Sequence, residues 1–159
     1  MGVITGLSAL LAAAALGLTA GALLAEGAIL VVFWRSLPPA SFLGWYKEHA
    51  ALLQRFFGAL EVAAAALTML AAALSWVATD VSRHLLGVSA LLSVAVLAVF
   101  PLYFQRVNAG FAAGTIAAEH VAGELRRWRS WHWIRTVIAT GAFLFAMVAL
   151  MTSGTTPAA

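Results

Sequence analysis

The sequence predicts an all-α membrane protein, a polytopic bundle of four helices that forms one domain over residues 1–159. Of its residues 64% are hydrophobic and only 9% are charged, whereas about a quarter of the residues in a soluble domain are charged. The apolar residues fall into four runs, each long enough to cross a bilayer as a helix, which takes about 20 residues. These runs lack the alternation of barrel strands, so helices are the simplest interpretation.

The four expected helices cover about residues 6–34, 53–77, 84–104 and 133–152. The first run has no positively charged start and is too long for the apolar core of a signal peptide, so we expect it to remain as a helix. Pro38 and Pro39 should end this helix, whereas Pro101 lies inside the third helix and should kink it. The connections contain amphipathic pieces that either lie in the membrane interface as short helices or lengthen the second and fourth helices.

Lysine and arginine residues gather in the first and third connections, which hold eight of the nine: Arg35, Lys47, Arg55, Arg106, Arg126, Arg127, Arg129 and Arg135. The positive-inside rule therefore places both connections in the cytoplasm and both termini outside it, as in a multi-pass protein of a bacterial inner membrane. The net charge of +3 is not a nucleic-acid signature. The expected partner is the lipid bilayer, and a homo-oligomer or a larger membrane complex stays open.

The chain also matches itself at a shift of 71 residues, which aligns four pairs of charged or histidine residues: Arg35 with Arg106, Glu48 with Glu119, His49 with His120, and Arg55 with Arg126. Such a match is typical of parallel repeats, in which two helix pairs are related by an axis near the membrane normal. The repeat predicts that His49 and His120 lie at matching heights.

Two carboxylates in apolar helices are the strongest functional signal. Glu26 and Glu61 each lie eight residues from the expected cytoplasmic end of their helix, which is about 12 Å. A carboxylate at that depth needs a partner in the bundle interior and is a candidate site. The candidate partners are His132 and Arg135, which share one helix face, and Tyr103, Gln105 and Asn108 at the end of the third helix.

The stretch RRWRSWHWIRT, residues 126–136, is therefore expected to have two parts that lie at different depths in the membrane. Its first three arginines should stay with lipid headgroups, while His132 and Arg135 turn inward toward the two glutamates. A purely structural ion pair is the alternative for Arg135. His49 and His120 are either solvated interfacial residues or cofactor ligands. The small residues Gly17, Gly21 and Ala25 indicate close helix packing.

The order of these motifs resembles the anthrone oxygenase-like family of small four-helix membrane proteins. In that family a Pro and an Asn close the third helix, and a Trp, then a His or Asn, then Arg-Thr open the fourth. The residues that fall on this pattern are Pro101, Asn108, Trp128, Trp131, His132, Arg135 and Thr136. The chain departs from it in the insertion EHVAGELRR and in the separation of Pro101 from Asn108.

The resemblance implies oxygenation of an apolar aromatic substrate of the anthrone type. Three kinds of function stay open from the residues themselves. As an oxidoreductase, the bundle would use Glu61 or His132 as a base, with Glu26, Arg135 and Asn108 around the substrate, and would need no cofactor. As a cofactor protein, it would hold haem b or copper on His49, His120 or His132, or these histidines would join Glu26 and Glu61 around a non-haem metal. As a non-enzymatic membrane subunit or small-molecule binder, it would use its polar cluster for packing alone.

Overall fold

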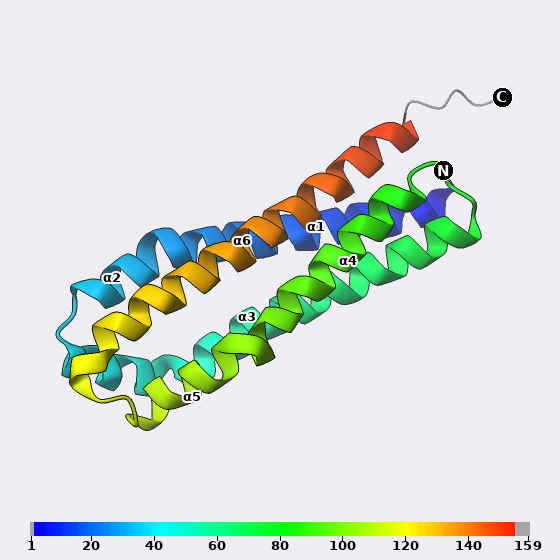
Figure 1. Cartoon of the computed structure of the whole chain (residues 1–159). Helices are drawn as coiled ribbons and strands as arrows, with labels where there is room; N and C mark the ends of the chain where they lie inside the picture. The colour runs from blue at the N-terminus through cyan, green and yellow to red at the C-terminus, as the bar shows by residue number, and fades with distance from the viewer. Residues whose placement is uncertain (1, 155–159) are drawn as a thin grey trace.

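The computed structural model describes residues 2–154, and nearly all of them are helical (Figure 1). Four helical spans run side by side, and each is long and apolar enough to cross a membrane: Val3–Ser36, Pro39–Val77, Arg83–Ala113 and Ala118–Thr152. No strand occurs in residues 2–154. The structure therefore confirms the predicted all-α four-helix bundle, whose spans fit a multi-pass integral membrane protein.

The first and third spans are each interrupted by a short π-helical turn. The first consists of α1 (Val3–Ala25), η1 (Glu26–Leu30) and α2 (Val31–Ser36), and the third of α4 (Arg83–Val99), η2 (Phe100–Phe104) and α5 (Gln105–Ala113). The second and fourth spans are the unbroken helices α3 (Pro39–Val77) and α6 (Ala118–Gly154). Helices α1 and α4 each pack against both α3 and α6, so the four spans form a ring in chain order.

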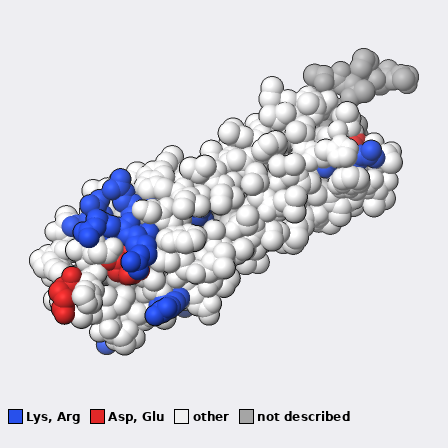
Figure 2. Space-filling view, viewed as in Figure 1, with Lys and Arg blue, Asp and Glu red and all other residues white. Residues whose placement is uncertain are grey.

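The two ends of the bundle differ in charge. The connections from α2 to α3 and from α5 to α6 lie at one end, while the start of α1, the end of α6 and the turn from α3 to α4 lie at the other (Figure 1). Lysine and arginine side chains crowd around the first of these ends (Figure 2). We call the half of the bundle next to it the charged half.

The second and fourth spans are longer at the charged end than the sequence predicted. Helix α3 begins at Pro39 instead of about residue 53, and α6 begins at Ala118 instead of about 133. The amphipathic pieces thus lengthen the helices, which was one of the two alternatives. The third span likewise continues through α5 and ends at Gly114, whose φ of 65° is left-handed. These extensions are helical because their apolar faces bury residues such as Phe42 and Leu125 in the core.

The core has a different composition in each half. In the charged half it is aromatic and contains Trp34, Phe42, Tyr46, Phe104, Phe111 and Trp128. In the other half it consists largely of alanine: Ala9, Ala12, Ala13, Ala64, Ala71, Ala72, Ala142, Ala146 and Ala149. We call this second part the alanine half. Large apolar side chains instead cover the outside of the spans, for example Leu18 at 67% and Leu91 at 73% exposure, as contact with lipid requires.

Two features bear on the predicted repeat. His49 lies twelve residues before Glu61 on α3, and His120 lies twelve residues before His132 on α6, so both histidines are about 18 Å along their helices from these residues. In addition, each of the two π-helical turns interrupts an odd-numbered span, at residues 26–30 and 100–104. Both features accord with parallel pairs, and the superposition of the pairs stays a prediction.

Candidate functional site

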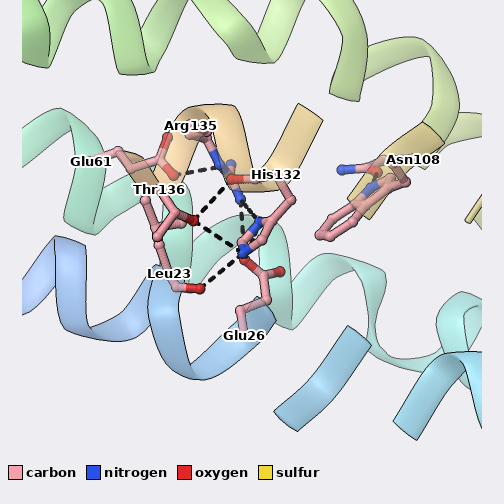
Figure 3. Close-up of polar contacts among 8 residues, drawn as sticks. Leu23, Glu26, Glu61, Asn108, His132, Arg135 and Thr136 are labelled. Atoms are coloured by element: carbon pink, nitrogen blue, oxygen red, sulfur yellow. Dashed lines mark hydrogen bonds and ion pairs between the residues drawn. The ribbon is translucent and has the colours of Figure 1, made fainter. Parts of the chain in front are cut away.

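The four residues singled out by spacing and depth meet inside the bundle (Figure 3). Arg135 on α6 donates a hydrogen bond from Nη2 to Oε2 of Glu26 at 3.1 Å, and its Nη1 lies 3.1 Å from Oε1 of Glu61. Their exposed fractions are 6% for Glu26, 5% for Glu61, 5% for Arg135 and 0% for His132. One guanidinium therefore joins a carboxylate of the first span to a carboxylate of the second span. The sequence does not show that these two carboxylates share a partner.

The two carboxylates are not held equally. Glu26 accepts a hydrogen bond from Arg135, whereas Oε1 of Glu61 forms an ion pair with Arg135 but has no hydrogen-bond partner among residues 2–154. Nε of Arg135 also has no acceptor, and the guanidinium lies over the ring of Phe104 at 4.5 Å. A buried oxygen without a hydrogen bond is costly, so Glu61 has capacity to accept one from a bound molecule.

His132 is neutral in this arrangement, and its neighbours identify the tautomer. Its Nε2 lies 2.8 Å from the carbonyl oxygen of Leu23, which can only accept, so Nε2 carries the hydrogen. Its Nδ1 lies 3.2 Å from Nη2 of Arg135, which can only donate, so Nδ1 accepts. The 3.5 Å contact of Nδ1 with Glu26 is then not an ion pair. Because both ring nitrogens are engaged, Glu61 is the better candidate base of the two.

A glycine that the sequence did not single out makes this contact possible. Gly27 lies in the π-helical turn η1, and a Cβ atom there would be 2.9 Å from Nε2 and 3.0 Å from Cδ2 of His132. Only a residue without a side chain lets the imidazole approach the backbone of α1 so closely. The packing predicted for Gly21 is wrong, since no atom lies within 4 Å of a Cβ built there, whereas a Cβ at Gly17 would be 3.0 Å from Phe143.

Asn108 does not contact the cluster directly but is linked to it through Trp128. Its Oδ1 accepts a hydrogen bond of 2.9 Å from the indole nitrogen of Trp128, and that ring stacks on His132 with centroids 5.0 Å apart and planes 10° apart. Asn108 on α5 thereby fixes the position of His132 through Trp128. Among the other candidates on this span, Tyr103 donates instead to Glu124 at 2.8 Å.

A cavity of about 580 Å³ reaches the cluster between α3 on one side and η2 and α5 on the other. Its inner end contains Glu26, Glu61 and Arg135, and its outer lining includes exposed positions of α3 and α5. The walls are mostly apolar and include the rings of Tyr46, Phe57, Phe100, Phe104 and Trp128. Gly58 also lines this space, and a Cβ there would meet no atom within 4 Å. We call it the α3–α5 cavity.

The two remaining candidate histidines lie outside the cluster. His49 bonds through Nδ1 to the carbonyl oxygen of Trp45 at 2.8 Å and stacks on that indole, while His120 is exposed near the start of α6. Across residues 2–154 no group of three or more His, Cys, Asp or Glu side chains is placed to hold a metal ion. The arginines predicted to stay at the surface, Arg126, Arg127 and Arg129, are exposed, as expected.

Comparisons of the chain with protein-family models, with curated proteins and with solved structures found no match.

Proposed function

We propose that this protein is an oxygenase of the anthrone oxygenase-like type, which binds a flat, mainly apolar aromatic substrate in the α3–α5 cavity. The observation that carries the proposal is the cavity itself, a space of about 580 Å³ with aromatic walls and the carboxylates of Glu26 and Glu61 at its inner end. Its size lies in the range of small-molecule sites, which are mostly apolar with a few convergent polar groups.

In the proposed reaction Glu61 acts as the general base. Its Oε1, which accepts no hydrogen bond from the protein, takes a proton from the acidic ring methylene of the substrate. The resulting carbanion reacts with dioxygen, which is the oxidant: the CH₂ group becomes a ketone, one oxygen atom stays in it and the other leaves as water. Arg135 remains beside the negative charge throughout and stabilises it.

A purely structural role for the cluster is the second candidate, and one observation favours it. Nε2 of His132 and Nη2 of Arg135 both bond to the first span, at Leu23 and Glu26, so they tie α6 to that span whether or not a ligand is present. On this alternative the bundle is a packing subunit of a membrane complex. The two candidates differ in the role of Glu61: the oxygenase needs its carboxylate to take a proton from the substrate, whereas in the structural role it only pairs with Arg135.

We also propose the orientation in which the charged end faces the cytoplasm of a bacterial cell. Its support is the position of eight of the nine lysine and arginine residues in the first and third connections. A reporter that is active only in the cytoplasm should then give no signal when fused to the C-terminus, and a bright reporter would reverse the orientation.

The test of the proposed function uses a variant that fills the cavity. A Cβ at Gly58 would meet no atom within 4 Å and Gly58 lines the cavity, so Gly58→Phe should fold but lose binding of an anthrone-type substrate and its oxygen consumption. Gly44→Phe is the matched control, because it lies on the same helix, has equal room for a Cβ and does not line the cavity.

Glu61→Gln separates binding from chemistry. It should keep the substrate bound and reduce the rate of oxygen consumption by about 10² or more, the contribution expected of a general base. If Glu61→Gln or Gly58→Phe consumes oxygen as fast as the parent protein, the proposed function is wrong and the structural alternative is favoured.

A further inference from the structure

The inner end of the α3–α5 cavity carries an excess of negative charge. Two carboxylates, Glu26 and Glu61, share one guanidinium, and His132 beside them is neutral. With both carboxylates ionised, the cluster has a formal charge of −1. A lone buried charge is expensive in the hydrocarbon region, so a proton or a bound cation is needed to compensate it.

The rest of the cavity offers no second cation at that depth. Of the residues that line it, the charged ones are Glu26, Glu61, Arg135 and Arg55, and Arg55 is an exposed residue of the rim. Arg135 already faces both carboxylates. The compensating charge must therefore come from outside the protein.

The walls suit an organic cation in two ways. Five aromatic side chains line the cavity, and the negative face of an aromatic ring attracts a cation at about 6 Å or less. At the inner end, Oε1 of Glu61 forms an ion pair with Arg135 but no hydrogen bond within the described part of the chain. An apolar molecule with one positive charge would thus meet rings along its length and, at its end, two carboxylates that share a single guanidinium.

We infer that the α3–α5 cavity binds apolar aromatic cations at the Glu61 end, each in exchange for one proton. The inference shares the cavity with the proposed function but does not depend on the oxygenase chemistry. The proton belongs to the two carboxylates together. The other titratable or charged groups facing them release no proton on binding: Arg135 from α6 stays protonated, and His132 from α6 and Tyr46 from α3 stay neutral.

The experiment compares three ligands built on one anthracene ring, bearing a trimethylammonium, a hydroxymethyl or a sulfonate group. Their fluorescence anisotropy is measured with the full-length protein in neutral detergent micelles, and Gly58→Phe gives the signal of partition into the micelle. We expect the cation to bind at least about tenfold more tightly than the neutral alcohol, and the anion to bind weakest. In weakly buffered solution, binding of the cation should release one proton per site, and binding of the alcohol should release none.

Two variants assign the preference to the carboxylate. Glu61→Gln should bind the cation and the alcohol equally, whereas Glu61→Asp, which keeps the charge, should restore the preference. If the alcohol binds but the cation binds no better, or if no proton is released, the inference is overturned while the proposed function stands. If none of the three binds above the level of Gly58→Phe, both fail, because the cavity then takes no aromatic ligand.

Discussion

The charged half and the alanine half are built from the same four spans but are packed in opposite ways. In the alanine half, small side chains allow the helices to approach closely, and Ser89 on α4 donates a hydrogen bond of 2.8 Å across to the carbonyl oxygen of Ala142 on α6. In the charged half, the large rings of Trp34, Phe104 and Trp128 pack in the core between the helices. Phe104 and Trp128 also line the α3–α5 cavity. Within the hydrocarbon region helices associate through close packing and not through the hydrophobic effect, so the alanine half can hold the bundle together while the charged half keeps an open site.

The largest loss of stability is expected at Arg135, because the cluster in the charged half contains buried charges and the core of the alanine half contains none within residues 2–154. Arg135→Met leaves two carboxylates, each at most 6% exposed, without their common partner, and breaking a buried pair in this way costs about 3–5 kcal/mol. Thermal unfolding in detergent should show the loss. Arg127→Met is the control: its side chain is 66% exposed and its ion pair with Glu124 should contribute less than about 1 kcal/mol. Equal stability of the two variants would mean that Arg135 does not hold the spans together.

The second prediction concerns close packing in the alanine half. Ala71 on α3 is 1% exposed, so Ala71→Leu must push neighbouring helices apart, which costs about 1–3 kcal/mol. Ala73→Leu on the same helix makes the same change at an exposed position and should be nearly neutral. Chemical denaturation of both variants in the same micelles provides the measurement. If Ala71→Leu unfolds at the same denaturant concentration as Ala73→Leu, the alanine half is not tightly packed.

The smallest predicted effect lies at Gly27, where the two halves meet. Gly27→Ala places a methyl group 2.9 Å from Nε2 of His132, so the imidazole must move away from the carbonyl of Leu23 and lose its hydrogen bond. The expected cost is about 1 kcal/mol, because the lost bond is partly offset by the better helix propensity of alanine. Gly21→Ala, which meets no atom within 4 Å, should instead be stabilising. Nitrogen chemical shifts of labelled His132 should change in Gly27→Ala and not in Gly21→Ala.

Several parts of the site could be predicted from local spacing. Glu26 and Glu61 stood out because carboxylates are rare in apolar helices, and His132 and Arg135 were paired with them because residues three apart share a helix face. The structure brings these four together. The prediction that Arg126 and its neighbours stay at the surface also follows from the cost of burying an unpaired guanidinium, and these side chains are exposed.

Other parts could not be predicted, because they depend on distances between spans. Gly27 and Gly21 are both glycines of the first span, and only the position of α6 makes one of them a close contact and the other an open position. His132 and His49 are both histidines near a tryptophan in the sequence, yet one lies in the cluster and the other stacks on Trp45. The helix extensions at the charged end were ambiguous for the same reason, since an amphipathic segment is stable either in the interface or against a core.

The sequence by itself determined that the chain suits a membrane, that it has four spans and that two of the spans carry a carboxylate within an apolar stretch, because hydrophobicity is a property of one segment at a time. The predicted depth of Glu61 assumed a helix start at about residue 53, whereas α3 begins at Pro39. The tertiary structure alone decided that Arg135 joins both carboxylates, that His132 is the neutral tautomer with hydrogen on Nε2, and that the α3–α5 cavity ends at Glu61. These features need atoms from three different spans to lie within hydrogen-bonding distance or around one space. Such distances are set by how aromatic and alanine side chains fill the gaps between helices, and no single helix contains that information.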